Sequence, residues 1–321
     1  MGGFSSDSGS SSSYDWSHDD KVSKKSAESY AKDDSRTYSG STSKGIEPPV
    51  GKDIEATEKM AAILVVDVTG SMQSWPRQIF QKIPTLYSEA NAAIQGKSPS
   101  ELAKSKGNLE DKLELSVIAI GDTHSDSHPL QVVDFSKGGE LVKGVNQIYP
   151  EGGGGSFGEE SYGLAAYFID KHCKTPKTPK GVKPLLVFAC DEDFYSTISP
   201  SEIKRYTGDV VKQSIDTDEV IKSLVKKYDV FVLRPELGES DVYQRAEKHW
   251  KDLVQEERVM KMSDPKRLVD CFIALAGYAS NNFESAEEML KRRQTPEQVK
   301  EVLKTLHPLL EKDEKKKNKK K

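Results

Sequence analysis

The sequence has few apolar residues and few cysteines. Hydrophobic residues make up 35% of the 321 residues and aromatic residues 8%, below the roughly 45–50% apolar content of ordinary globular domains. This shortfall predicts that part of the chain lies outside a packed core. The 3 cysteines are widely spaced and form no CxxC pair, which argues against a disulfide framework or a cysteine-rich zinc site and favours a reducing compartment.

A long apolar run and an excess of one charge are also missing. No stretch approaches the roughly 20 apolar residues that span a bilayer, and the first residues lack the apolar segment of a secretory signal. These absences favour a cytoplasmic protein. The 47 Lys and Arg residues nearly balance the 51 Asp and Glu residues, for a net charge of −4. Nucleic-acid binding depends on a concentrated excess of basic residues, so we expect no specific nucleic-acid partner.

The two ends of the chain account for much of the missing apolar content. Residues 1–57 begin with a stretch in which 15 of 43 residues are serine, and this composition predicts a disordered arm. Residues 312–321 contain seven lysines, and such a block of like charge predicts a disordered tail. The opening Met1–Ser6 also fits the loose pattern for N-myristoylation. A membrane-tethered scaffold is therefore an alternative, although we do not expect membrane contact.

Residues 58–281 alternate apolar runs with helical patterns. The runs that predict strands are Met60–Val66, Leu113–Ile120, Leu130–Phe135, Pro184–Cys190, Asp229–Leu233 and Arg258–Met262. The patterns that predict helices lie at Gln78–Ile94, Glu140–Ile148, Ser161–His172, Asp218–Lys227, around Trp250 and at Asp264–Ala279. This alternation predicts an α/β fold, a Rossmann-like, doubly wound and mostly parallel sheet between helices, in which the third strand can pair antiparallel at an edge. Residues 282–311 predict a helical extension of this domain.

Oxygen-bearing side chains follow two of the predicted strands and also enter a helix from a glycine-rich loop. They are Asp67, Thr69 and Ser71 after the first strand, Asp191 after the fourth, and Ser156 in the glycine-rich loop. In open α/β sheets, ligands bind beyond the carboxyl ends of the strands. The four glycines of Gly152–Gly155 allow a close backbone approach to such a site. Hard oxygen ligands with few charges suit Mg²⁺ or Mn²⁺, so the sequence predicts a metal site at this edge.

The spacing Asp67-x-Thr69-x-Ser71 after an apolar strand resembles the metal-ion-dependent adhesion site of von Willebrand factor A (VWA) domains. The resemblance implies that Thr69 and Ser71 bind Mg²⁺ through their hydroxyls and that Asp67 binds it directly or through water. It also implies a carboxylate after the fourth strand, which is Asp191 here, and a ligand from the glycine-rich loop. The candidates for the loop ligand are Ser156, Glu159 and Glu160.

The wider pattern, from Ile120-Gly121-Asp122 to Glu160-Ser161-Tyr162, resembles a bacterial intracellular subgroup of such domains. Members of the wider intracellular class often work beside AAA+ ATPases of the MoxR type. The implied function is a protein-interaction module, used in assembly or as an adaptor, that captures an Asp or Glu of a protein partner at the metal. No general base, nucleophile or nucleotide site accompanies the motif, so we expect no enzymatic activity.

Other interpretations of these residues stay open. Asp, Thr and Ser are favoured at helix N-termini, so the motif can be a simple cap, or a site that has lost its metal and kept the fold. A second cluster sets Asp122, His124, Asp126 and His128 at alternate positions. On an extended segment these four side chains would share one face. That cluster is the basis of the alternative function, a metal-dependent hydrolase.

Overall fold

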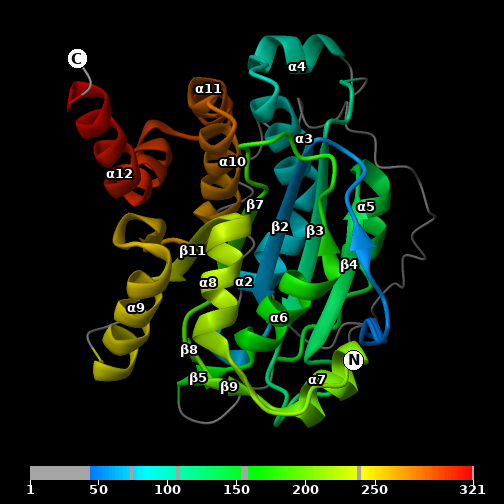
Figure 1. Ribbon diagram of the computed structural model, residues 1–321. Coiled ribbons are helices and arrows are strands. Elements are labelled where there is room, and N and C mark those ends of the chain that lie inside the picture. Colours follow the sequence, from blue (N-terminus) through cyan, green and yellow to red (C-terminus); the bar gives the residue numbers. More distant parts are fainter. Residues whose placement is uncertain (1–43, 73–74, 106–108, 153–157, 237–239, 320–321) are drawn as a thin grey trace, which may run out of the picture.

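Figure 1 shows the computed structural model, which describes residues 44–72, 75–105, 109–152, 158–236 and 240–319. Its centre is a six-stranded sheet with the order β12-β11-β7-β2-β3-β4. The strands are β2 (Met60–Asp67), β3 (Leu113–Ile120), β4 (Leu130–Ser136), β7 (Leu185–Ala189), β11 (Asp229–Pro235) and β12 (Val259–Met262). Neighbours pair in parallel except β3 and β4, which are antiparallel at one edge. The predicted doubly wound, mostly parallel α/β fold is confirmed.

Helices cover both faces of the sheet (Figure 1). One side holds α2 (Trp75–Gln81), α3 (Ile83–Ile94), α5 (Gly138–Val145), α10 (Leu268–Ala279), α11 (Phe283–Arg293) and α12 (Pro296–Lys319). The other side holds α6 (Tyr162–His172), α7 (Pro200–Thr207), α8 (Thr217–Lys227) and α9 (Asp241–Val254). Alternate residues of β2 enter the two cores, Leu64 on the first side and Val65 on the second, as the two-residue period of a strand requires. Both faces of the sheet are therefore buried.

Short strand pairs complete the described architecture. They are β1 (Ile54–Glu55) with β6 (Cys173–Lys174), β5 (Glu159–Glu160) with β8 (Asp193–Phe194), and β9 (Thr197–Ile198) with β10 (Ile215–Asp216). The pair β5–β8 lies next to the end of β7 in sequence and bears on the candidate site. A short helix, α4 (Pro99–Ser105), packs against α11. Among the described residues, no helix combines the length and the apolar character of a membrane span.

The predicted helix Gln78–Ile94 is two helices. The first, α2, ends at Gln81 and α3 begins at Ile83. Pro84 occupies the first turn of α3, where its missing N–H costs little, whereas it could not donate inside a continuous helix. The apolar spacing runs across the break, which is why the pattern predicted one element.

The prediction of a disordered arm to residue 57 is wrong for residues 44–57. Ile54 and Ala56 are 2% and 0% exposed, and β1 pairs in parallel with β6. The imidazole of His172 lies 2.9 Å from Asp53 and 3.0 Å from Asp209, and this contact fastens the segment to the end of α6. The few apolar residues of the segment are buried against the domain. A low content of apolar residues therefore does not make this segment disordered. Residues 1–43, the remainder of the predicted arm, lie outside the described residues.

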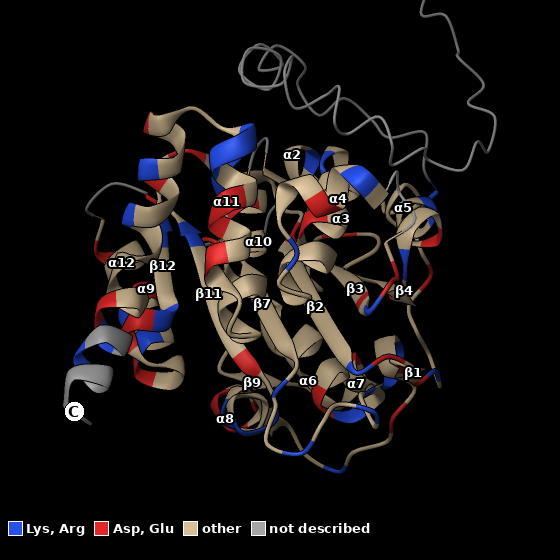
Figure 2. Cartoon of the chain, turned by 90° about the horizontal axis from the view of Figure 1, so that it is seen from above, with Lys and Arg blue, Asp and Glu red and all other residues tan. Residues whose placement is uncertain are grey.

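The C-terminal helices are an integral part of the fold. Buried side chains of α11 and α12 belong to the same apolar core as α3 and α10, so the predicted boundary at residue 281 divides one core. The tail predicted to be disordered from Lys312 is helical to Lys319. Lys312 pairs with Glu257, and Lys315 lies 2.6 Å from Glu311, which offsets part of the repulsion between lysines. Figure 2 shows both charge signs on α12, whereas β2 and β7 are largely uncharged.

Candidate metal centre

The candidate centre lies where the sheet changes its direction of growth. The strands that follow β2 lie first on its β3 side, and from β7 onward they lie on its other side. Ligands of doubly wound sheets bind at such a switch point. Asp67 ends β2 and Asp191 follows β7 by two residues, and the two strands pair through Val66 and Ala189. Both carboxylates therefore leave the sheet at the same edge and on neighbouring strands.

Both described ends of the glycine-rich segment reach this edge. The Gly152 amide donates to the Val68 carbonyl at 3.0 Å, and the Asp193 amide donates to the Gly158 carbonyl at 3.2 Å. The first bond joins the segment to the exit of β2, and the second joins it to the turn after β7. The three sequence segments that predicted the site are therefore neighbours in the fold. Ser156, the predicted loop ligand, lies outside the described residues.

The residues of the Asp67-x-Thr69-x-Ser71 motif are linked by hydrogen bonds. Oδ1 of Asp67 accepts from the Thr69 amide at 2.8 Å and from the Thr69 hydroxyl at 2.6 Å. The Thr69 and Ser71 hydroxyl oxygens are 3.1 Å apart. Asp67 and Thr69 are buried, and Ser71 is exposed at the start of a 3-10 turn. A simple turn can form the same local bonds, so the case for a metal depends on the second carboxylate.

The second carboxylate, Asp191, is buried without a hydrogen-bond partner among the described residues. Its carboxylate is 1% exposed, and within the described residues neither of its oxygens has a hydrogen-bond partner. The neighbouring Arg234 guanidinium instead donates to the backbone carbonyls of Asp191 and, at 3.3 Å, of Glu192. A buried carboxylate without a partner costs several kcal/mol. Two unpartnered oxygens, with the Ser71 hydroxyl close enough to lower the pKa of Asp191, fit a divalent cation, for which oxygen ligands and retained waters are typical.

Several carboxyl groups with raised pKa values lie around this position. Burial raises the pKa of both Asp67 and Asp191, and the charge of Asp191 raises that of Asp67 further. Hydrogen bonds from Thr69 and Tyr162 oppose the shift of Asp67. Burial, followed by the charge of Asp67, raises the pKa of Glu160 to about 10. Burial and then Asp191 raise that of Glu192 to about 7. Each of these carboxylates would ionise more readily beside a cation.

The predicted site residues differ in their placement. Asp67, Thr69 and Ser71 form one cluster, and Asp191 is close enough to Asp67 for the two charges to interact. Of the two glutamates considered for the loop ligand, Glu159 is exposed, while Glu160 is buried with one oxygen unpartnered among the described residues. Glu160 is therefore the better placed of the two.

Tyr162 and Arg234 contact the candidate site residues Asp67 and Asp191, and the sequence interpretation gave neither of them a role. Tyr162 is buried at the start of α6 and donates a hydrogen bond to Oδ2 of Asp67. Arg234 is 3% exposed. A basic residue near the end of the otherwise apolar run of β11 was a signal for Arg234, because a buried charge in a strand needs a reason. Tyr162 belongs to the Glu160-Ser161-Tyr162 segment that carries the resemblance, but nothing in that segment indicates a contact with Asp67.

The donor set depends on hydroxyls. In the described part of the chain, no group of three or more His, Cys, Asp or Glu side chains is arranged to hold a metal ion. A cation at this edge would therefore need Thr69 and Ser71 as well as Asp191. Such a set carries little negative charge and suits Mg²⁺ or Mn²⁺ better than a softer metal.

The second cluster, at residues 122–128, is a self-bonded turn. The Asp126 amide donates to the Asp122 carbonyl at 2.9 Å, and the Asp126 carboxylate accepts from the Asp122 amide at 2.7 Å. The His124 side chain is 62% exposed, and the His128 amide donates to Glu151. The extended segment that would have aligned the four side chains is absent from residues 122–128. The carboxylates instead stabilise the turn, so the hydrolase alternative loses its geometric basis.

Comparisons with known proteins add a likeness of fold. No family model matches the sequence, and no curated protein matches it. The pilus adhesin SpaC from Lactobacillus rhamnosus GG, in its open conformation, is similar with 12% identity over 73% of this chain and a TM-score of 0.48. A second SpaC structure has 12% identity over 73% of this chain and a TM-score of 0.44. Proximal thread matrix protein 1 from the mussel byssus has 11% identity over 70% and a TM-score of 0.43. This chain spans 31%, 32% and 49% of those three structures.

Proposed function

We propose that this protein is a VWA-type interaction module that binds Mg²⁺, or Mn²⁺, at the β2–β7 edge and captures a carboxylate of a protein partner. The observation that carries the proposal is the buried Asp191 carboxylate, whose two oxygens have no hydrogen-bond partner among the described residues. It lies at the switch point of the sheet and near Ser71, whose hydroxyl is 3.1 Å from that of Thr69. Buried charges in proteins are normally paired or coordinate a metal.

Different side chains would orient the ligands of such a cation and anchor the turn that carries Asp191. Asp67 orients the Thr69 hydroxyl through a 2.6 Å hydrogen bond, and Tyr162 holds the other oxygen of Asp67. Arg234 anchors the backbone of the turn that carries Asp191. A bound divalent cation supplies a concentrated positive charge that attracts a further carboxylate. The contacts of Asp67, Tyr162 and Arg234 therefore hold the proposed ligands in place for binding.

We further propose that the module acts in assembly or as an adaptor, without enzymatic activity. The partner presents an Asp or Glu, and a MoxR-type AAA+ ATPase is a candidate of the kind that the resemblance implies. Specific nucleic acid and membrane contact are not part of this proposal, and the proposed location is the cytoplasm. Support comes from the Asp67-x-Thr69-x-Ser71 motif and its position at the sheet edge.

Isothermal calorimetry with Mg²⁺ tests the metal site. The wild-type protein should bind one equivalent, and the double variant Asp67→Ala with Ser71→Ala should give no binding heat. Asp134→Asn is the control, because Asp134 is a half-exposed carboxylate on β4 that pairs with Lys52 at 2.7 Å, and this variant should bind as the wild type does. Absence of Mg²⁺ and Mn²⁺ binding by the wild type would identify a scaffold without a metal and remove the proposal.

A further inference from the structure

Arg234 is a buried cation that forms no ion pair among the described residues. It is the penultimate residue of β11 and is 3% exposed. Its guanidinium donates to the backbone carbonyls of Asp191 and Glu192. Within the described residues it forms no ion pair, whereas the buried Arg267 and Arg293 both pair with Asp270. An arginine has further N–H donors beyond the two used here, and an unpaired buried charge is costly. Arg234 therefore has both the need and the capacity to bind an anion.

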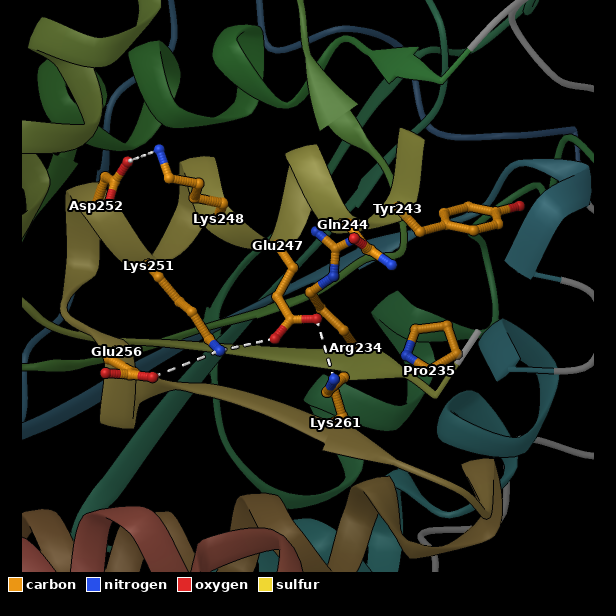
Figure 3. A pocket seen from close by; sticks show the side chains of 10 residues that line it. All are labelled: Arg234, Pro235, Tyr243, Gln244, Glu247, Lys248, Lys251, Asp252, Glu256 and Lys261. Carbon is orange, nitrogen blue, oxygen red and sulfur yellow. Dashed lines mark ion pairs between the residues drawn. The ribbon is translucent and has the colours of Figure 1, made fainter. Parts of the chain in front are cut away.

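A pocket of about 570 Å³ opens beside Arg234, between β11, β12 and α9 (Figure 3). At one end, Lys251 and Lys261 already have carboxylate partners, because both pair with Glu247, at 2.7 Å and 3.1 Å, and Lys251 also pairs with Glu256 at 3.8 Å. Tyr243 lies at the opposite end from Lys251 (Figure 3). After burial, the charges of Asp191 and Glu192 are what raise the pKa of Tyr243, so this end adjoins the candidate metal centre.

We infer that the Arg234 end of this pocket is a second acidic subsite, so that the partner segment presents two acidic residues, one to the cation and one to Arg234. This inference rests on the proposed function. Arg234 bonds to the backbone of Asp191 itself, so the two subsites are close neighbours. Residues in an extended segment advance about 3.3 Å each, and acidic residues at adjacent or alternate positions can therefore reach both subsites.

The chemistry of Arg234 favours a carboxylate over other groups. The planar guanidinium matches a carboxylate in a charge-assisted hydrogen bond, which is about twice as strong as a neutral one. A basic residue would be repelled by both the cation and Arg234. A neutral residue would leave the guanidinium as it is in the free protein, without a counter-anion. An acidic pair is the partner chemistry that satisfies both charges at once.

Peptide binding to the full-length protein in saturating Mg²⁺ tests the inference. The probes are capped peptides in which an Asp is followed, at the next or the next-but-one position, by Glu or by Gln. Wild type should bind the better Asp–Glu peptide about tenfold more tightly than its Asp–Gln counterpart. Arg234→Gln should bring this ratio close to one. Arg234→Lys should keep a ratio of a few fold, because it retains the charge without the planar fork.

Lys248→Gln is the matched control, because Lys248 lines the same pocket and pairs with Asp252 at 3.5 Å. This variant should keep the tenfold preference. A preference that survives in Arg234→Gln overturns the inference. If wild type binds the single-acid peptide in a Mg²⁺-dependent way without preferring the second acid, the inference fails and the proposed function stands. If wild type binds no metal, both fail. Should Arg234→Gln not fold, a tenfold preference unchanged in Arg234→Lys overturns the inference.

Discussion

The hydroxyl of Tyr162 donates a hydrogen bond to Oδ2 of Asp67, and both residues are buried. Oδ1 of Asp67 is already engaged by Thr69, so both oxygens of this carboxylate have protein partners. Asp191 shows the reverse pattern, since neither of its oxygens has a partner among the described residues. Under the proposed function, the two carboxylates thus have different roles. Asp67 organises the hydroxyls of the motif, and Asp191 is the carboxylate available to a cation.

Replacing Tyr162 tests the organising role of Asp67. Tyr162→Phe removes a donor from a buried carboxylate, so the free energy of unfolding without Mg²⁺ should fall by about 1–3 kcal/mol. Urea denaturation in EDTA and in Mg²⁺ measures this loss. Tyr228→Phe is the control, because Tyr228 is also buried but donates to the neutral carbonyl of Cys173 at 3.3 Å. It should cost less and leave the response to Mg²⁺ unchanged. Wild-type stability of Tyr162→Phe in EDTA would contradict the assignment.

Replacing Asp191 should separate stability from metal binding. Asp191→Asn removes a buried charge that has no described hydrogen-bond partner, so the metal-free protein should be as stable as wild type or more stable. The rise in melting temperature that Mg²⁺ gives the wild type should disappear. Asp170→Asn is the control variant, which should lower the stability of the metal-free protein and keep the Mg²⁺ response. Asp170 is buried but pairs with Lys227 at 2.8 Å and accepts from Ser223 at 2.6 Å, so its loss should destabilise the protein and leave the Mg²⁺ response intact.

The stability of the metal-free protein should depend on pH in a specific direction. Asp67 and Asp191 have pKa values raised above the ordinary 3.8, so the folded state holds protons that the unfolded state releases. Stability then falls as the pH rises from the unfolded pKa to the folded pKa. A bound cation removes this penalty because it stabilises the ionised forms. The Mg²⁺-induced rise in melting temperature should therefore be larger at about pH 8 than at about pH 5.5. An equal rise at both values would show that these carboxylates do not hold the metal.

The sheet and the first part of the site were predictable because their signals are local. The apolar runs that became β2 and β3 are continuous, and Asp67, Thr69 and Ser71 are separated by single residues. Residues at strand ends also converge by a general rule of open sheets. That rule drew attention to Asp191, and the resemblance to VWA domains assigned it as the carboxylate after the fourth strand.

Other features depend on contacts between distant parts of the chain. Tyr162 meets Asp67 across 95 positions, and Arg234 meets Asp191 across 43, so no spacing in the sequence could reveal either pair. The tail from Lys312 was predicted from charge alone, whereas its helix is supported by the distant Glu257. The order of residues 44–57 likewise depends on a strand pair with Cys173 and Lys174. The composition of a segment does not show which distant residues it packs against.

The C-terminal helices should unfold together with the sheet. Asp270 of α10 is 1% exposed and accepts from Arg267 at 2.7 Å and from Arg293 of α11 at 2.5 Å, and Arg293 also pairs with Glu89 of α3 at 2.9 Å. Asp270→Ala leaves two buried guanidinium groups without this carboxylate, which should cost about 3–5 kcal/mol.

Urea unfolding of the Asp270→Ala variant, followed by circular dichroism and by tryptophan fluorescence, measures this loss and its cooperativity. Trp250 is buried in the core on the other side of the sheet and Trp75 in the same core as α10, so tryptophan fluorescence includes signals from both cores. Because α11 and α12 share one core with α3 and α10, both probes should give a single coincident transition. Glu287→Gln, which breaks a pair with the exposed Lys291, should cost less than about 1 kcal/mol. Two separate transitions would instead make residues 282–319 an independently docked extension.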